Sequence, residues 1–438
     1  MRLRDRLYYG WVMLLALACT QVVSWGILYY GFSVFLKPVG DDLGWSRAAM
    51  TGAFSLALAC SGVAGLFVGR WVDRHGPRLL MTGGSCAAAL LLLALSAVHT
   101  LRLFYLIWAA LGVTMAAIFY EPAFAAIATW FSHYRARALT IITFVGGFAS
   151  VIFIPLISWL IRTQGWRAAL VTLAVILALT TIPLHALILR RHPRDLGLLP
   201  DGGPISSRQA AGSGQQAEVG AIHESPSLST PHTQPSVRAR DAFRSASFRW
   251  LTGAFCLAFL ANVAVTVHLI PYLTDHGFST GFAATAAGLI GILALPGRLI
   301  FTPLGGHIPR RYVAAGIFLF QTLGLVVLVT TTSTAGVITF VILFGIGFGA
   351  ITPARAALVA EMYGPREYGT ISGVLALFVT GARAAAPVSA GILYTLFGRY
   401  DPVFWILIVI SILGMGAILL IERDLPEPVV ADGMMAQV

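Results

Sequence analysis

The chain has 438 residues, of which 58% are hydrophobic and only 11% charged, and its formal net charge is +11. A soluble globular domain normally carries about 25% charged residues. The composition therefore excludes a water-soluble domain and requires a surface that faces lipid. In such a chain the positive charge indicates basic membrane loops rather than nucleic-acid binding.

Apolar stretches long enough to cross a bilayer recur from end to end. Backbone groups in lipid must be satisfied within the segment, and the alternating pattern of an outer-membrane barrel is absent, so these spans are predicted to be helices. The apolar stretch near the N-terminus has no convincing cleavage site and is expected to be a retained first span. The twelve predicted spans are 9–36, 46–69, 79–98, 101–130, 139–161, 166–189, 250–273, 281–304, 312–332, 334–362, 370–397 and 402–421.

A segment of different composition separates the sixth span from the seventh. It is rich in Ser, Pro, Gln, Gly and Arg and has few large apolar residues, which is typical of a flexible linker. We therefore expect an N-terminal six-helix bundle over 1–190, a linker over 191–248, a C-terminal six-helix bundle over 249–425 and a tail over 426–438.

Basic residues are unevenly divided between the two sides of the predicted spans. If both termini are cytoplasmic, the inner segments carry 20 Arg, whereas the outer segments carry 6 Lys or Arg. Cytoplasmic loops are enriched in Lys and Arg. The bias predicts an inner-membrane protein with both termini, the linker and the tail in the cytoplasm.

The two halves of the chain resemble each other. LFVGRWVDRHGPR (66–78) aligns with TPLGGHIPRRYV (302–313), and YEPAFAAIATWFSHYRARALT (120–140) aligns with ITPARAALVAEMYGPREYGTI (351–371). A six-span repeat joined by a linker is the plan of a two-bundle transporter, with its substrate site between the bundles near the membrane midplane. The predicted fold class is thus all-α and integral to the membrane, with twelve transmembrane helices in two pseudo-symmetric bundles.

The stretch GRWVDRHGPR (69–78) lies between the second and third predicted spans. Gly69 permits close helix approach, and Asp73 can meet an Arg or the positive end of a neighbouring helix. The stretch closely resembles the loop signature of the major facilitator superfamily. This resemblance implies an alternating-access carrier in which Asp73 and Arg74 belong to a gating element, not to the substrate site. The second-half copy has Pro309 in place of the Asp, so no equivalent latch is expected there.

Few ionisable residues lie inside the predicted spans. Each costs about 2.5–3.5 kcal/mol to insert, so such residues usually face a cavity and act in function. Three arginines against one deeply placed carboxylate leave a cationic interior, and a planar guanidinium matches a carboxylate through two parallel hydrogen bonds. The set comprises Glu121, His268, Arg298, Arg355 and Arg383, with Glu361 near the inner end of its span.

Two of these arginines carry a closer resemblance. GILALPGRLIFTPLGGHI (291–308) looks like the eighth helix of the monocarboxylate porters, which implies that Arg298 binds a substrate carboxylate. TGARAAA, around Arg383, resembles the eleventh helix of the bacterial oxalate/formate antiporters, which carries a basic residue. Animal porters have an Asp one turn before the Arg; here the residue is Ala294, which puts an Asp-based proton relay in doubt.

Other side chains are weaker candidates. Tyr30, Tyr120, Asn262 and His268 can each help to bind a carboxylate, although packing explains each of them about as well. By pseudo-symmetry Glu121 and Arg355 can form a gate ion pair that breaks in each transport cycle. Glu121 can instead carry the proton, since burial raises the proton affinity of a carboxyl group and an adjacent Arg opposes this.

The sequence contains no motif for nucleotide hydrolysis, metal binding or nucleophilic catalysis. There is no P-loop, no HExxH or paired Cys/His metal pattern and no GxSxG elbow, so we expect no ATP use, no cofactor, no metal and no enzymatic activity. The prediction is a secondary transporter of small carboxylates of the lactate, pyruvate, formate or oxalate type, with proton symport favoured over anion exchange. A drug or neutral-solute exporter of the same fold and a non-transporting membrane sensor remain alternatives.

Overall fold

The computed structural model describes residues 8–131, 134–202, 239–304, 308–363 and 368–421. Within these residues eleven helical stretches are long and apolar enough to cross a membrane. One of them, Arg137–Ile188, has 52 residues. It turns at Gly165, whose φ of 77° interrupts the helix, so it contains two of the predicted spans. The prediction of an all-helical protein with twelve spans is confirmed.

The first half of the chain forms six spans, several of them irregular. The first span consists of α1 (Tyr9–Ser24), the π-helix η2 (Trp25–Tyr30) and α2 (Gly31–Leu43), and the fourth is divided into α5 (Leu101–Ile118) and α6 (Tyr120–Trp130). The other elements are α3 (Arg47–His75), α4 (Pro77–Ser96), α7 (Arg135–Gly146), α8 (Phe148–Pro183) and the π-helix η3 (Leu184–Ile188).

The second half is more regular. Its elements are α10 (Ala239–Arg244), α11 (Ala246–Asp275), α12 (Thr280–Leu304), α13 (Arg310–Thr330), α14 (Thr334–Tyr363), α15 (Tyr368–Phe397) and α16 (Asp401–Leu419). Between the halves, two short 3₁₀ turns, η4 (Pro193–Leu196) and η5 (Pro200–Gly202), follow the sixth span. The central part of the predicted linker, 203–238, and the predicted tail, 426–438, lie outside the described residues.

The GRWVDRHGPR stretch is mostly helix rather than loop. Helix α3 continues through His75, and Gly76, with a φ of 79°, makes the turn into α4, which begins at Pro77. A glycine adopts positive φ without strain, and proline fits the first position of a helix. These two residues therefore place the turn at Gly76, inside the segment predicted to separate the spans, and α3 ends six residues beyond the predicted span end at 69.

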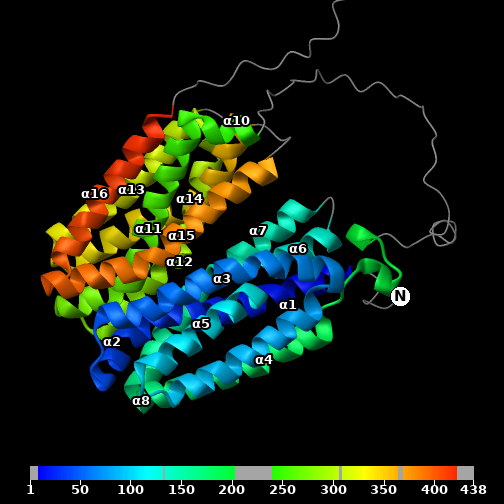
Figure 1. Ribbon diagram of the computed structural model, residues 1–438, viewed down its shortest axis with the longest axis horizontal. Helices are drawn as coiled ribbons and strands as arrows, with labels where there is room; N and C mark the ends of the chain where they lie inside the picture. The colour runs from blue at the N-terminus through cyan, green and yellow to red at the C-terminus, as the bar shows by residue number, and fades with distance from the viewer. Residues whose placement is uncertain (1–7, 132–133, 203–238, 305–307, 364–367, 422–438) are drawn as a thin grey trace, which may run out of the picture.

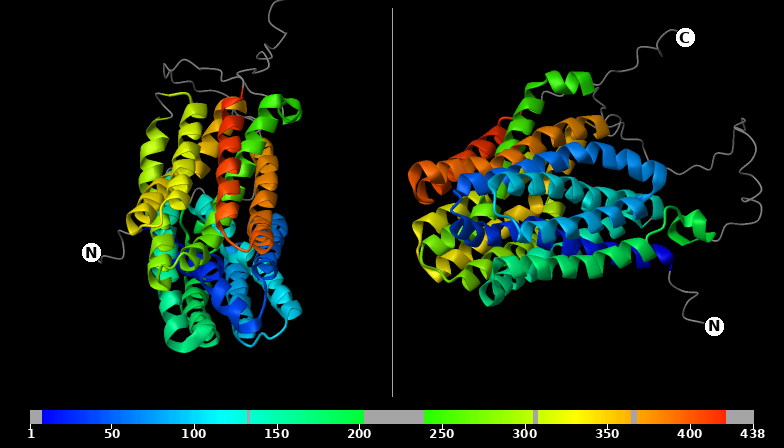
Figure 2. Two further views of the ribbon diagram at one scale, coloured as in Figure 1. Left: turned by 90° about the vertical axis from the view of Figure 1, so that its left-hand side faces the viewer. Right: turned by 60° about the horizontal axis from the view of Figure 1, so that its bottom comes forward.

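The helices pack as two bundles that lie side by side (Figures 1 and 2). The first bundle contains α1 to α8 and the second contains α11 to α16. Among the described residues the most extensive contacts between the bundles are those of α3 with α15, α8 with α12, and α2 with α11. The substrate site predicted between the bundles must therefore be bordered by these helices.

The two ends of the molecule are named here after one residue each. The Arg47 end carries the turns around residues 44–46, 97–100, 165, 276–279, 331–333 and 398–400, and the Arg310 end carries the turn at 76 and the segments 189–202 and 239–245. Among pairs of described residues, the hydrogen bonds and ion pairs that cross between the bundles lie in the half nearer the Arg47 end. They join Arg47 to Asp275 and Tyr400, Ser55 to Val388, and Ser150 to Gly288.

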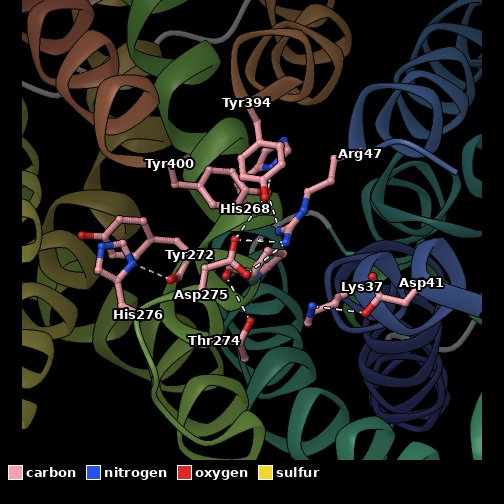
Figure 3. A network of polar contacts seen from close by, with 11 residues as sticks. Lys37, Asp41, Arg47, His268, Tyr272, Thr274, Asp275, His276, Tyr394 and Tyr400 are labelled. Carbon is pink, nitrogen blue, oxygen red and sulfur yellow. Dashed lines mark hydrogen bonds and ion pairs between the residues drawn. The ribbon is translucent and has the colours of Figure 1, made fainter. Parts of the chain in front are cut away.

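Arg47 is the centre of the contact at its end (Figure 3). Its Nη2 lies 3.0 Å from each carboxylate oxygen of Asp275, at the end of α11, and its Nη1 donates to the Tyr400 hydroxyl at 3.0 Å. Its guanidinium also lies 4.4 Å from the ring centroid of Tyr394 and 5.0 Å from that of Tyr400. The side chains of Arg47 and Asp275 are only 15% and 26% exposed, so the ion pair is largely shielded from water.

The network continues from Tyr400 toward the middle of α15. His268, fully buried on α11, lies 2.9 Å by Nδ1 from the Tyr400 hydroxyl and 3.0 Å by Nε2 from the Pro387 carbonyl. A carbonyl only accepts, so Nε2 carries the proton and Nδ1 accepts from Tyr400. Burial raises the pKa of the Tyr400 phenol, which keeps that donor protonated. A directed chain thus runs from Arg47 through Tyr400 and His268 to Pro387.

Removal of the Arg47 charge should make the two bundles separate more often at the Arg47 end. In a protein without its native cysteines and with Val388→Cys as reporter, Arg47→Met should speed labelling by a bulky maleimide in detergent about tenfold. The reason is that a hydrogen bond to a charged group contributes about 1.5–3 kcal/mol and each 1.4 kcal/mol is about tenfold in population.

The matched control is Lys37→Met, which breaks only the exposed Lys37–Asp41 pair within α2. Its labelling rate should equal that of the parent. Equal rates for Arg47→Met and Lys37→Met would show that the Arg47 network does not hold the bundles together.

Candidate functional site

Arg383 lies halfway along α15, in the second bundle, and is half-buried. Its guanidinium carbon is 5.9 Å from the ring centroid of Phe259 on α11, and that of Arg355 on α14 is 5.7 Å from the same centroid. No hydrogen bond or ion pair joins Arg383 to another described residue. The structure thus brings two of the three predicted arginines to one aromatic ring.

Contacts with α3 fix the height of Arg383 in the molecule. The backbone N–H of Val388 donates to Ser55 Oγ at 3.1 Å, and Gly62 packs against the Thr380 side chain. Arg383 lies between Thr380 and Val388, so it lies at the level of the α3 segment 55–62. This segment belongs to the opposite bundle, and Arg383 is therefore close to the boundary between bundles.

Arg298 is in the helix that borders the boundary on its other side. It lies two turns after Gly291 of α12, where a Cβ would overlap the Ser150 hydroxyl of α8. The position of the Arg298 side chain lies outside the described part of the structure. The predicted role of Arg298 stays a prediction.

Aromatic side chains cluster around the irregular part of the first span, inside the first bundle. Trp25 stacks on Phe119 with ring centroids 4.2 Å apart and an interplanar angle of 17°, and it lies 5.2 Å from Tyr120. Tyr30 lies 6.5 Å from Trp25. Trp25, Tyr30 and Tyr120 are half-buried, whereas Phe119 is buried. The two predicted tyrosines thus belong to one aromatic layer, together with a tryptophan that the sequence analysis did not single out.

This layer comes from two irregular stretches of backbone. Trp25 and Tyr30 lie in a π-helix, and Phe119 separates α5 from α6 with a ψ of −154°. Single-turn π segments are frequent at functional sites, and non-helical backbone at membrane depth occurs where it is buried in protein or lines a cavity. The irregularity favours a site at this level of the first bundle.

Gln21 of α1 stabilises the break in the fourth span. Its amide nitrogen donates to the carbonyls of Ile118 at 2.8 Å and Phe119 at 3.3 Å, and its amide oxygen accepts from the Trp25 indole at 3.1 Å. Interrupting a helix frees carbonyl groups, which are costly to leave unsatisfied away from water. Gln21 therefore fixes both the break and the position of Trp25.

Glu121 lies in the first turn of α6 and is exposed. No ion pair joins Glu121 to Arg355, so the pair suggested by pseudo-symmetry is absent between these two described residues. Glu361 pairs instead with Arg310, at 3.1 Å, near the Arg310 end. Neither carboxylate neutralises Arg383 in this structure.

Two predicted ligands lie inside the second bundle. Asn262, 2% exposed, accepts a hydrogen bond from Gln321 of α13 at 2.9 Å, and its amide nitrogen has no partner among the residues that the structure describes. His268 has both ring nitrogens occupied, as described above. The structure therefore does not bring Asn262 or His268 onto the Phe259 ring with the two arginines.

The two predicted gating residues of the GRWVDRHGPR stretch are at the Arg310 end. Asp73 and Arg74 occupy the last turn of α3, where Arg74 is exposed, and the Asp73 side chain lies outside the described part. No group of three or more His, Cys, Asp or Glu that could hold a metal ion occurs among the described residues.

Comparison with known proteins agrees with this architecture. A family model described as Major Facilitator Superfamily matches residues 14–387 and 343–434. Monocarboxylate transporter 13 from Bos taurus is 25% identical over 94% of this chain and 89% of its own length. The fujikurins efflux protein of Gibberella fujikuroi is 26% identical over 75% of this chain and 64% of its own length.

A solved structure shares the fold. A bacterial homologue of the human lysosomal transporter Spinster, in an inward-facing and unoccupied conformation, superposes with a TM-score of 0.71 at 16% identity, covering 95% of this chain and 98% of that one. The two-bundle helical architecture and the family match over most of the sequence lead to one conclusion: this integral membrane protein belongs to the major facilitator superfamily of transporters.

Proposed function

We propose that the protein is a secondary transporter of small carboxylate anions and that Arg383 binds the carboxylate. The observation that carries this proposal is the half-buried guanidinium of Arg383, which has no polar partner among the described residues and shares the Phe259 ring with Arg355. The likeness to monocarboxylate transporters supports the same substrate class.

The physical argument is electrostatic. A guanidinium away from bulk water is stabilised by an anion, and a second cation near the same ring increases the positive potential felt by that anion. The ring face attracts both cations through its quadrupole, which keeps them near each other despite their repulsion. In this proposal Arg298 of α12 supplies a further cationic contact from the adjacent helix.

The distribution of cross-bundle contacts suggests a conformation. The bundles are joined by polar contacts in the half nearer the Arg47 end, and the Arg-rich turns are at the Arg310 end. With the Arg310 end in the cytoplasm, as the excess of Arg predicts, the structure is closed to the outside. The linker and both termini then lie in the cytoplasm. The proposed gating residues are on the same cytoplasmic half, where they would control opening and closing of that end: Asp73, Arg74, Glu121 and Arg355.

An exporter of drugs or neutral solutes is the second candidate, supported by the likeness to the fujikurins efflux protein of Gibberella fujikuroi. In that alternative the arginines would pair with Glu121 and Glu361. Glu361 is engaged by Arg310, and Glu121 makes no ion pair with Arg355 or Arg383 here. The observed pairing therefore favours an anion as the partner of Arg383.

Arg383→Gln should lower carboxylate transport strongly. In proteoliposomes, kcat/KM for lactate or oxalate should fall about 10- to 100-fold, because a charge-assisted hydrogen bond contributes about 1.5–3 kcal/mol. The measurement is uptake of radiolabelled acid under an inward proton gradient, or after preloading with unlabelled acid to detect exchange.

Arg102→Gln is the matched control, because Arg102 is an exposed residue near the Arg47 end. Its uptake should equal that of the wild type. If both variants transport at the wild-type rate, the cation of Arg383 is structural and the carboxylate proposal fails.

Glu121→Gln tests proton coupling. If Glu121 carries the proton, the variant should lose at least about tenfold in accumulation driven by a pH gradient while retaining exchange of labelled for unlabelled acid, because exchange needs no net proton movement. A variant that still accumulates substrate with the wild-type dependence on the proton gradient would assign the proton to another group or make the protein an exchanger.

A further inference from the structure

We propose that His268 is a proton-binding site controlled by Arg47: it binds a proton when the bundles separate at the Arg47 end and releases it when Arg47 returns to Tyr400. The ligand is the hydrogen ion itself, taken up from water at the Arg47 end. The inference does not depend on the cargo, because it requires only that the two bundles open in turn at the two ends of the molecule, as in rigid-body alternating access.

The first argument is the direction of the hydrogen bonds when this end is closed (Figure 3). A guanidinium has only donors, so the Tyr400 oxygen accepts from Arg47 at 3.0 Å and gives its own hydrogen to Nδ1 of His268, 2.9 Å away. The other ring nitrogen, Nε2, donates to the Pro387 carbonyl at 3.0 Å. With these partners His268 is neutral.

A second proton on His268 does not suit this arrangement. Nδ1 of an imidazolium donates, so the Tyr400 oxygen would have to accept from two cations at once. The Tyr400 hydrogen would then need a new acceptor, yet Tyr400 is 1% exposed and its hydroxyl has no further hydrogen-bond partner among the described residues. The contact of Arg47 with Tyr400 and the protonation of His268 therefore oppose each other.

The second argument is the division of these groups between the bundles. Arg47 belongs to α3 of the first bundle, whereas His268 and its two partners, Tyr400 and Pro387, belong to the second. So does Asp275, which lies two turns beyond His268 on α11 and pairs with Arg47. Separation of the bundles removes the cation and leaves the carboxylate, and this change favours the imidazolium.

The proton has a defined place in the open state. Water enters the opened end, and a proton adds to the lone pair of Nδ1 of His268. The new N–H donates to the Tyr400 oxygen, and the Tyr400 hydrogen turns to water. Nε2 keeps its bond to the Pro387 carbonyl, and no other covalent bond of the protein changes.

Most other ionisable groups around His268 keep their partners when the bundles separate. Arg383 is one turn before Pro387 on α15 and moves with His268. The remaining contacts lie within one bundle and join His276 to Asp401, Lys37 to Asp41, Tyr394 to Asp275, and Tyr272 to the Leu328 carbonyl.

The carboxylate of Asp275 is the rival for a pH response, because its protonation would also release Arg47. The two explanations differ in range, since a carboxyl group ordinarily titrates near about pH 3.9 and an imidazole near about pH 6.5. The open state holds the His268 proton more tightly in our proposal. Its population must therefore rise as the pH falls through the imidazole range.

Distances between the bundles test the inference in purified protein without any cargo. Spin labels on Arg102→Cys and Thr332→Cys, exposed positions at the Arg47 end of opposite bundles, report the separation by pulsed electron paramagnetic resonance in nanodiscs. The native cysteines are replaced. The ratio of open to closed molecules should rise about tenfold or more from about pH 8 to about pH 5, because one coupled proton permits up to about tenfold per pH unit.

Two histidine variants locate the titration. His268→Gln keeps an amide donor for the Pro387 carbonyl but does not titrate, so its ratio should change less than about twofold over the same range. His276→Gln is the matched control, because His276 is a histidine of the same end whose partner, Asp401, lies in its own bundle. This control should keep the wild-type response.

A wild-type distance that does not change with pH overturns the inference without any substitution. A full response in His268→Gln, or its loss in His276→Gln, also overturns it. If His268→Gln does not fold, the wild-type midpoint decides: a midpoint above about pH 5 supports the imidazole, and one below it assigns the response to the Asp275 carboxyl. These results need no lactate or oxalate, so the carboxylate proposal stands or fails separately in the uptake assays.

Discussion

A guanidinium held in the middle of a membrane helix is the constraint around which the second bundle is organised. Arg383 is one turn before Pro387, which has no N–H to donate to the Arg383 carbonyl in the ordinary helical pattern. The next N–H, of Val388, donates to Ser55 of the opposite bundle. The segment that carries the cation is therefore also the segment whose backbone is bonded across the boundary between bundles.

The same segment connects the site to the Arg47 end. His268 donates to the Pro387 carbonyl and accepts from Tyr400, which accepts from Arg47. Separation of the bundles at the Arg47 end must break the contact of Arg47 with Asp275 and Tyr400 and the bond between Ser55 and Val388. Both changes act on α15 within two turns of Arg383. Opening of that end and the position of the candidate binding group are thus physically linked through α15.

The sequence predicted the spans well because length and hydropathy depend on local composition. It did not predict the π-helix at Trp25–Tyr30, which contains no proline. At the break beside Phe119, Pro122 has no N–H to donate to the Ile118 carbonyl, and that carbonyl accepts instead from Gln21, almost a hundred residues away, which local composition does not reveal. Arg47 and Asp275 were missed for a related reason. Charges at span ends are ordinary, and only the packing of α3 beside α11 makes them partners. The candidates Arg355 and Arg383 were found because an ionisable residue inside a span is rare.

The two bundles repeat a common plan but divide the chemistry unequally. In the first bundle a polar side chain stabilises irregular backbone, as Gln21 does at the α5–α6 break. In the second bundle α14 and α15 are continuous helices that carry arginines, and Phe259 of α11 holds two of them. These arginines are not part of the repeated scaffold. In the alignment of the two halves, the counterparts of Arg298 and Arg383 in the first half are apolar, near Gly62 and Val151. The asymmetry therefore puts the candidate anion-binding cations on one side of the boundary between bundles.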